Sequence, residues 1–205
     1  MNNFAQLVGD VAAVPVFSHE NHGCRFVSFP LRVLRLSGTA DLPNVIVPEA
    51  LSAGLEEGRR IHVCGQLRSY NNHTPRPDGP QNRLLILMWG RSWEPCDDDY
   101  ENRVMLSGTL CRVPIYRRTP YGREISDVML RVERPTGIPG MPRRCDYLPC
   151  VTWGSVARMA AQLPPHSKLS VSGRLQSRGY TKVIDGESFE RTAYEVSVCE
   201  AAAVV

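Results

Sequence analysis

Arginine and tyrosine side chains lie close together near the C-terminal end of the chain. In the segment VSGRLQSRGY at 171–180, Arg174 and Arg178 alternate beside Tyr180. An arginine offers a planar fork that holds phosphate through paired hydrogen bonds, and a flat ring stacks on a nucleobase. A groove for a single nucleic-acid strand needs both kinds of group.

A second group of the same kind lies in an expected hairpin loop. It consists of Tyr116, Arg117, Arg118, Tyr121 and Arg123. Any one aromatic residue can equally be a packed core residue. Rings beside cations are nevertheless the kind of cluster that a nucleic-acid groove uses.

The total charge gives weaker information. The formal net charge is only +3, so bulk electrostatics do not require an anionic partner. Lys168 and Lys182 are the only lysines, and 22 of the 24 basic residues are therefore arginines. A GC-rich genome could explain this bias without any functional role.

Catalytic and metal-binding patterns are absent from the sequence. Five histidines, at 19, 22, 62, 73 and 166, show no HExxH spacing, and no serine lies in GxSxG. Glu56 and Glu57 adjoin on an expected solvated helix end. The nearest approach to a zinc set is Cys145 and Cys150 with His166, but small buried thiols are the favoured interpretation. We expect no enzyme activity and no cofactor.

The cysteine pattern and the hydropathy favour a cytosolic protein. Seven cysteines, at 24, 64, 96, 111, 145, 150 and 199, form no CxxC pair, which is typical of reduced thiols. No apolar run approaches the roughly 20 residues of a membrane helix. The N-terminal segment lacks the features of a signal peptide.

The 205 residues fit either one large domain or two of about a hundred, and an internal repeat decides for two. Matching blocks recur at three offsets: Asn3, Leu7, Gly9 and 31–33 at 99, 42–45 at 106, and Val63, Gly65, Leu67 and Ser69 at 108. The offset changes only in segments expected to be loops, where insertions are tolerated. We interpret the chain as a duplicated domain.

Both copies predict the same order of elements. Apolar alternation and turn residues indicate strands at 4–11, 26–36, 44–47, 60–67 and 83–89, and again at 103–110, 124–133, 148–153, 168–175 and 191–198. One short helix is expected between the third and fourth strands of each copy, in PEALSAGLEEG and SVARMAAQLPP. Glycines inside the first and fourth strands suit sharp bends.

This order is that of the OB-fold. We therefore expect an all-β protein of two tandem OB-fold barrels, each five-stranded with one short helix between strands 3 and 4. The expected boundaries are an N-terminal OB-fold at 1–93, a polar linker at 94–101 and a C-terminal OB-fold at 102–205.

The second copy contains the segments NRVMLSGTL, DVMLRVER, DYLPCVTWG, VSGRLQSRGY and ERTAYEVSV. Through these segments, and most strongly through DYLPCVTWG and VSGRLQSRGY, about residues 102–200 resemble the bacterial single-stranded DNA-binding protein family. The chain thus looks like a tandem version of a family whose usual members carry one domain and form tetramers. The resemblance implies sequence-tolerant binding of single-stranded DNA in replication, recombination or repair.

Three aromatic positions match those on which the family stacks bases. They are Tyr147, Trp153 and Tyr180. With the basic and aromatic residues above, and with Arg131 on the second strand, they make ten candidate DNA contacts: Tyr147, Trp153, Tyr180, Arg174, Arg178, Tyr116, Arg117, Arg118, Tyr121 and Arg131.

The first copy lacks these aromatics. At the matching offsets, Asp41, Val47 and Asn72 replace Tyr147, Trp153 and Tyr180, and Tyr70 lies two residues out of register. The strand at 83–89 is apolar on both faces, which suggests burial against a neighbour. We expect the first domain to be a scaffold or interface, although Arg32, Arg35, Arg68 and Tyr70 could touch the DNA backbone.

The expected partners are single-stranded DNA and a second copy of the chain, because a homodimer would combine four OB-folds. Replication or recombination proteins are further possible partners. The family usually recruits partners through an acidic C-terminal tip, and we do not expect recruitment by that route because the last residues read VSVCEAAAVV. A cytoplasmic, nucleoid-associated location is expected, with chromosomal, phage or mobile-element origin open. The alternative function is that of a primosome-like OB-fold adaptor acting mainly by protein contact.

Overall fold

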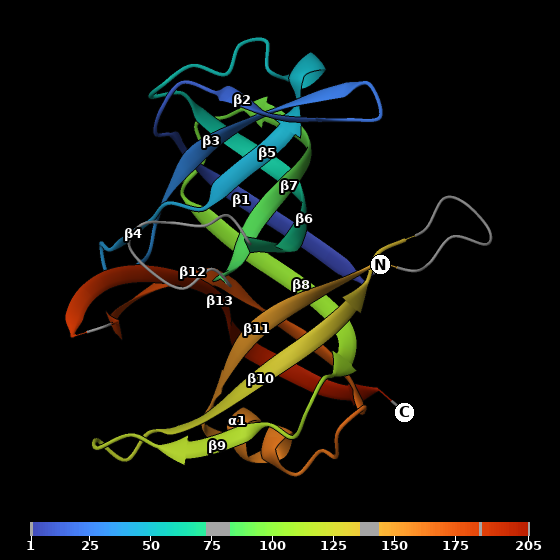
Figure 1. Ribbon diagram of the computed structural model, residues 1–205, viewed down its shortest axis with the longest axis vertical. Helices are drawn as coiled ribbons and strands as arrows, with labels where there is room; N and C mark the ends of the chain where they lie inside the picture. The colour runs from blue at the N-terminus through green and yellow to red at the C-terminus, as the bar shows by residue number, and fades with distance from the viewer. Residues whose placement is uncertain (1, 73–82, 136–143, 185, 205) are drawn as a thin grey trace.

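Two closed rings of strands make up the computed structural model (Figure 1). It describes residues 2–72, 83–135, 144–184 and 186–204. The first ring contains five strands: β1 (Asn3–Val11), β3 (Cys24–Leu34), β5 (Asn44–Pro48), β6 (Arg60–Asn72) and β7 (Arg83–Pro95). The second ring contains five more: β8 (Glu101–Leu110), β10 (Glu124–Glu133), β11 (Cys145–Trp153), β12 (Lys168–Ile184) and β13 (Glu187–Val204). Both rings have the strand order of an OB-fold, as expected.

Three short strands lie outside the two rings. They are β2 (Val16–Asn21) and β9 (Ile115–Arg118), which pair with β3 and β10, and β4 (Ala40–Asp41), which pairs with β3. None of them was expected from the sequence. In both copies the fourth and fifth strands are also longer than expected, and β12 and β13 form a hairpin that extends far beyond the second ring (Figure 1).

The helical segments of the two copies differ. The second copy has α1 (Gly154–Ala161), whereas the first has only the 3-10 turn η1 (Glu49–Leu51) in place of the longer helix expected there. Gly54 and Gly58 both have positive φ, at 86° and 83°. This backbone conformation ends a helix, so the segment after η1 continues as turns. No helix in the described ranges is long and apolar enough to span a membrane.

Apolar side chains that alternate along the strands fill both rings with one continuous core. Leu7, Phe29 and Leu67 are fully or almost fully buried in the first ring, as are Leu130 and Leu175 in the second. Gly65 and Gly173 lie at β-bulges, where an added Cβ would collide with the carbonyl oxygens of Trp89 and Ser197. Only glycine allows the strands to approach this closely.

Antiparallel pairing of β1 with β8 joins the rings into one sheet. Ala5 pairs with Val104, which is its own counterpart at the offset of 99, and the pairs on either side run symmetrically outward. The two copies are therefore related by a local two-fold axis at this pair. Asn3 and its counterpart Asn102 each exchange two hydrogen bonds with the backbone of the fourth strand of their own copy.

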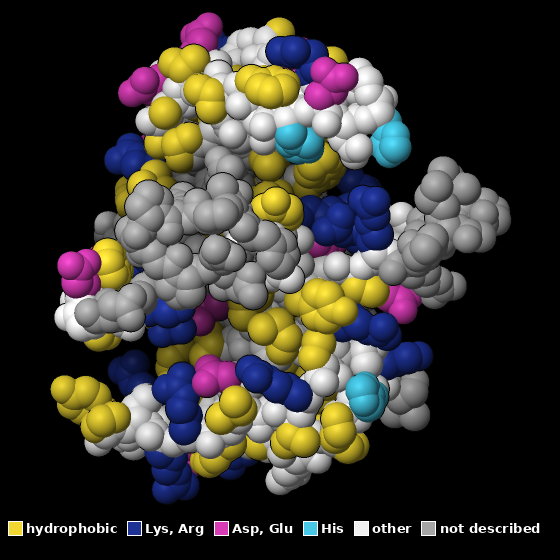
Figure 2. All heavy atoms as spheres, in the orientation of Figure 1, with side chains coloured by type: hydrophobic (Ala, Val, Ile, Leu, Met, Phe, Trp, Pro, Cys, Tyr) yellow, Lys and Arg dark blue, Asp and Glu magenta, His cyan; other side chains and the backbone are white. Residues whose placement is uncertain are grey.

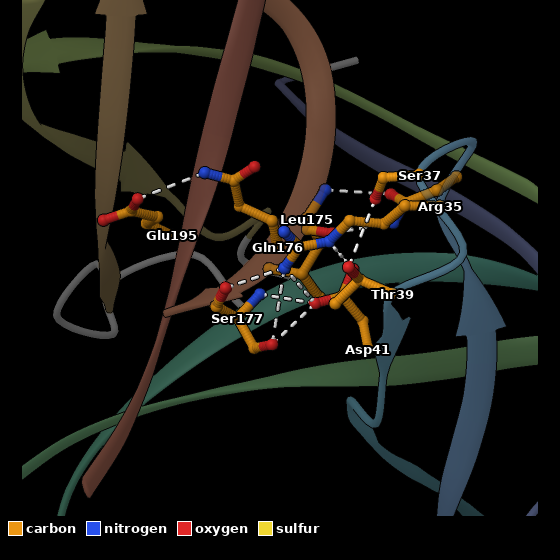
Figure 3. A network of polar contacts seen from close by, with 9 residues as sticks. Arg35, Ser37, Thr39, Asp41, Leu175, Gln176, Ser177 and Glu195 are labelled. Atoms are coloured by element: carbon orange, nitrogen blue, oxygen red, sulfur yellow. Dashed lines mark hydrogen bonds and ion pairs between the residues drawn. The ribbon is translucent and has the colours of Figure 1, made fainter. Parts of the chain in front are cut away.

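A second, polar connection crosses between the rings, and we call it the reciprocal clasp: Arg35, Asp41 and Ser177 on one side, Arg134, Asp146 and Ser69 on the other. Arg35 forms a two-point ion pair with Asp41, at 2.6 and 2.7 Å. The same Asp41 accepts hydrogen bonds from the backbone N–H and hydroxyl of Ser177, at 2.7 Å each (Figure 3).

The other half of the reciprocal clasp repeats this arrangement. Arg134 forms a two-point ion pair with Asp146, at 2.6 and 2.9 Å, and the backbone N–H of Ser69 donates to the same carboxylate at 2.8 Å. Both aspartates are almost fully inaccessible, with side chains 1% and 0% exposed. Each ring therefore fixes the fourth strand of the other ring through a buried carboxylate.

Residues 96–100 connect the rings and are tied to the first ring. The Tyr100 hydroxyl donates to Asp10 at 2.6 Å, and the Arg60 guanidinium lies 4.1 Å from the centre of the Tyr100 ring. Arg32 and Arg60 also donate to Asp10, at 2.7 and 2.8 Å. Burial would raise the pKa of Asp10, but the hydrogen bonds from Arg60, Tyr100 and Arg32 outweigh it and lower this pKa to about 2.

The reciprocal clasp predicts a large stability cost for Asp41→Ala. This change leaves a poorly exposed Arg35 and the N–H of Ser177 without their carboxylate, and removing one partner of a buried ion pair costs about 3–5 kcal/mol. Chemical denaturation measures the free energy of unfolding. Glu56→Ala is the control, because its pair with Arg59 is exposed and contributes at most about 1 kcal/mol. Equal losses in the two variants would contradict a structural role for the clasp.

Acid should destabilise the protein through Asp10 and Asp41. Burial alone would raise the pKa of Asp41, but hydrogen bonds from Arg35 and Ser177 lower it below its ordinary value. Carboxylates with depressed folded pKa values stabilise the fold above their unfolded pKa of 3.8, and this stability is lost as the pH falls toward the folded values, about 2 for Asp10. As the pH is lowered from neutral, the melting temperature should fall less steeply for Asp10→Asn than for the unmodified chain. Parallel curves would count against this assignment.

Candidate nucleic-acid interface

The outward face of the second ring, which we call the binding face, brings several of the predicted residues together. Directly opposite residues in neighbouring antiparallel strands point to the same side of a sheet. Arg131 of β10 lies opposite Tyr147 of β11, and Ile125 lies opposite Trp153. Tyr147 and Trp153 are 45% and 38% exposed. Two rings and a cation are thus available to solvent on the same side.

The β12–β13 hairpin continues the binding face. Ser197 of β13 is paired with both Val151 of β11 and Arg174 of β12, and its hydroxyl accepts a hydrogen bond from the Trp153 indole at 3.2 Å. Arg178 and Tyr180 follow Arg174 at even positions along β12 and therefore share its side. The predicted alternation of arginine and tyrosine on this strand is present in the structure.

The aromatic and basic group predicted in the hairpin loop at 116–123 is divided between the two sides of β9. Arg117 lies opposite Ile125, hence on the binding face, and forms a two-point ion pair with Asp127 at 3.1 and 3.2 Å. Tyr116 and Arg118 point to the opposite side, where both contact Glu124.

The side away from the binding face is occupied by helix α1. There Glu124 also pairs with Arg158 of the helix, and the hydrogen bond from the Tyr116 hydroxyl is the main cause that lowers the pKa of Glu124. Tyr121 lies in the turn and is 94% exposed. The structure therefore brings seven of the ten predicted residues onto one face, places Tyr116 and Arg118 on the opposite side, and leaves Tyr121 in the turn.

Three residues of the binding face were not predicted. Lys182 follows Tyr180 on the same side of β12 and lies opposite Phe189, and the Arg191 guanidinium lies 5.6 Å from the Phe189 ring centre. The even spacing from Arg174 to Lys182 could have identified the lysine. Phe189 and Arg191 required knowledge of the hairpin register.

The third strands of the two copies correspond to each other in a register that differs from the one inferred from the sequence. Pairing with the second strand places Asp41 opposite Val33 and Asp146 opposite Val132, and Val33 and Val132 are equivalent at the offset of 99. The third strands therefore match at an offset of 105, and the match at 106 was wrong. At 105 the alternation of buried and exposed residues coincides, whereas one residue of slip reverses it.

The corrected register changes the counterparts of the predicted aromatics. Tyr147 corresponds to Leu42 and Trp153 to Pro48, while Tyr180 still corresponds to Asn72. None of the three is aromatic, so the expectation that the first copy lacks these three rings holds.

The three first-ring arginines that the sequence suggested as backbone contacts are paired with carboxylates of the protein. Arg35 belongs to the reciprocal clasp, Arg68 pairs with Asp146 at 3.0 Å and Arg32 with Asp10. Burial is the main cause that lowers the pKa of Arg68. These side chains are therefore part of the framework. Tyr70, in contrast, is 57% exposed.

Among the described residues, no cluster of three or more His, Cys, Asp or Glu side chains could hold a metal ion. Cys145, Cys150 and His166 do not come together as such a group. All seven cysteines are free thiols. Burial raises the pKa of Cys150 above its ordinary value.

Comparisons with known proteins agree with this geometry. The sequence model of the Single-strand binding protein family matches residues 101–203. A single-stranded DNA-binding protein of Halalkalibacterium halodurans is 39% identical over 80 residues, which are 38% of this chain and 48% of that protein. Single-stranded DNA-binding protein A of Bacillus subtilis is also 39% identical over 80 residues, which are 38% of this chain and 46% of that protein. The chain thus spans about half the length of these relatives.

A solved structure resembles the whole fold. The wild-type single-stranded DNA binding protein from Thermus aquaticus superimposes with a TM-score of 0.76 at 21% identity, over 99% of this chain and 93% of that one. The likeness at this identity concerns the fold. It extends over both rings, whereas the family match lies in the second.

Proposed function

The chain belongs to the single-strand binding protein family, and from this premise we propose that it binds single-stranded DNA with little sequence preference. The observation that carries the proposal is the binding face, where Tyr147, Trp153 and Tyr180 lie on the same side as Arg131 and Arg174. Rings on which bases stack and cations that hold phosphates are the two elements of a single-strand groove.

The chemistry of the binding face accounts for tolerance to sequence. Every base has a flat face, and stacking on an aromatic ring contributes about 1–3 kcal/mol per base. Arginine forks on phosphates add affinity that depends on salt rather than on sequence. The proposed contacts are Tyr147, Trp153, Tyr180, Arg131, Arg174, Arg178 and Arg117, with Lys182 added. Tyr116 and Arg118 face α1 and are not proposed as contacts.

This function places the protein in replication, recombination or repair, where single strands are exposed. Proteins of the family are non-enzymatic DNA-binding proteins, and the chain is therefore interpreted as a binding protein without catalytic activity. We also propose a cytoplasmic, nucleoid-associated location and contact with replication or recombination proteins. Absence of DNA binding would favour the alternative function, a primosome-like OB-fold adaptor that acts mainly by protein contact.

Trp153→Ala and Tyr180→Ala should each weaken binding to an oligo-dT about tenfold or more, since each removes one stacking ring. Fluorescence anisotropy of labelled oligo-dT measures the affinity. The matched control is Tyr116→Ala, because Tyr116 is 39% exposed, almost the same as Trp153 at 38%, but lies on the opposite side of the sheet. The control should change the affinity little.

Two results of this titration would reject the proposed function. One is equal affinity for oligo-dT and for its duplex at the same salt concentration. The other is no binding at low salt, where phosphate contacts are strongest.

We further propose that two chains form a dimer. The central sheet β7–β6–β1–β8–β12–β13 leaves Met105 39% exposed, in a shallow groove lined also by Ser170, Ser172 and Ala202. The groove lies on β8, β12 and β13 of the second copy, and Met105 is the residue next to Val104 at the local two-fold axis. A second copy turned by a two-fold rotation would cover it and would bring together four rings, and two-fold dimers are the commonest closed assembly.

Light scattering at micromolar concentration should give twice the 22.9 kDa of the chain. Met105→Glu should shift the mass toward a single chain, because a carboxylate buried in such an interface lacks a partner. A single-chain mass for the unmodified protein, with and without DNA, would show that the dimer is wrong.

A further inference from the structure

Three aromatic rings gather on the outward face of the first ring, and we call them the ring cluster: His19, Phe26 and Trp89. They come from β2, β3 and β7. His19 stacks on Phe26 with ring centres 4.8 Å apart and planes at 12°, and the centres of Phe26 and Trp89 also lie 4.8 Å apart. Phe26 is 8% exposed, whereas His19 and Trp89 are partly exposed. The buried ring thus supports two rings that reach solvent.

The ring cluster lies at the position that corresponds to Trp153 in the second copy. Phe26 is the counterpart of Ile125, which lies opposite Trp153, and Trp89 is the counterpart of Ser197, which accepts the Trp153 hydrogen bond. The strand that carries Trp153 in the second copy carries Pro48 in the first. Aromatic surface is therefore present at the same place in both rings, but different strands supply it.

We propose that the ring cluster is a second stacking platform for a nucleobase, so that one DNA strand contacts both rings of the chain. This inference rests on the proposed function and extends it to the first ring. His19 lies opposite Phe26 as Arg117 lies opposite Ile125. The first ring thus offers flat ring surface where the second offers a cation beside a ring.

Partly exposed apolar side chains on β7, together with the exposed Tyr70, lead from the ring cluster toward the junction of the rings. Along β7 and β6 the pairs Trp89–Gln66, Leu87–Arg68 and Leu85–Tyr70 lie on one side, and Tyr70 is 57% exposed. Ser69, the residue that precedes Tyr70 in β6, belongs to the reciprocal clasp and donates its backbone N–H to Asp146. In Figure 2 hydrophobic side chains are spread over the upper ring, while most Lys and Arg side chains lie at the junction and on the lower ring. A strand would therefore be held by stacking on the first ring and by stacking plus charge on the second.

Tryptophan fluorescence separates the two platforms. A variant with Trp93→Phe and Trp153→Phe keeps only Trp89, and one with Trp89→Phe and Trp93→Phe keeps only Trp153. Trp93 donates its indole N–H to the Leu51 carbonyl and packs on the core, so its emission would only confuse the measurement. An oligo-dT of about 10 nucleotides fits one ring and one of about 30 reaches two.

We expect Trp153 emission to be quenched by both oligonucleotides and Trp89 emission to be quenched by the longer one. Unchanged Trp89 emission with quenching at Trp153 overturns the second platform and leaves the proposed function intact. No response at either tryptophan, with no binding by the unmodified chain, overturns both.

His19→Ala and Phe17→Ala provide a matched pair on the same hairpin. Phe17 is 54% exposed but lies on the other side of β3, under the Arg25 guanidinium at 4.7 Å. His19→Ala should weaken binding of the longer oligonucleotide about fivefold or more, and Phe17→Ala should leave it unchanged. Equal effects overturn the proposal.

Photo-crosslinking tests the unmodified chain and does not depend on how the tryptophan variants fold. Longer oligo-dT carrying 5-iododeoxyuridine should give adducts on peptides that contain His19 or Trp89, in addition to Trp153. Adducts confined to the second ring overturn the proposal.

Discussion

Two buried carboxylates determine how the halves of the molecule lie relative to each other. Asp41 and Asp146 each neutralise an arginine of their own ring and accept a backbone N–H from the fourth strand of the other ring. In the interior, such a charge is tolerated only with these partners. Since Ser177 is three residues from Tyr180, the reciprocal clasp also positions the hairpin that carries much of the binding face. The relative position of the two outward faces therefore depends on it.

Much of the fold could be predicted because its determinants are local. Strand alternation and turn residues predicted ten ring strands and the helix α1. The 3-10 turn in the first copy could not be distinguished from a helix in the sequence, because Leu51 and Leu55 have helical spacing. The positive φ of Gly54, inside the expected helix, is incompatible with its continuation. The offset of 106 between the third strands was inferred because Leu42 and Pro43 are identical to Leu148 and Pro149. The burial pattern and the strand pairing instead require an offset of 105.

The candidate site was predictable where all its residues lie on one strand. Arg174, Arg178 and Tyr180 share a side because a strand has a period of two, and this is legible in the sequence. In the β9 region the same rule does not say which parity faces the helix, so Tyr116 and Arg118 were grouped with Arg117. The ring cluster brings together His19, Phe26 and Trp89 from three strands. No local sequence pattern predicts these contacts.

The duplicated architecture separates what must be symmetric from what can differ. Asn3 and Asn102, Asp41 and Asp146, and Ser69 and Ser177 are identical pairs, and each makes the same hydrogen bond in both copies. These residues form hydrogen bonds with the other copy or with the fourth strand, which contacts the other copy. A change in one of them would therefore disturb the junction. Outward positions have no such restriction: Trp153 has Pro48 as its counterpart, and Ser197 has Trp89. A fused pair of rings can therefore keep one junction and give its two faces different means of holding a strand.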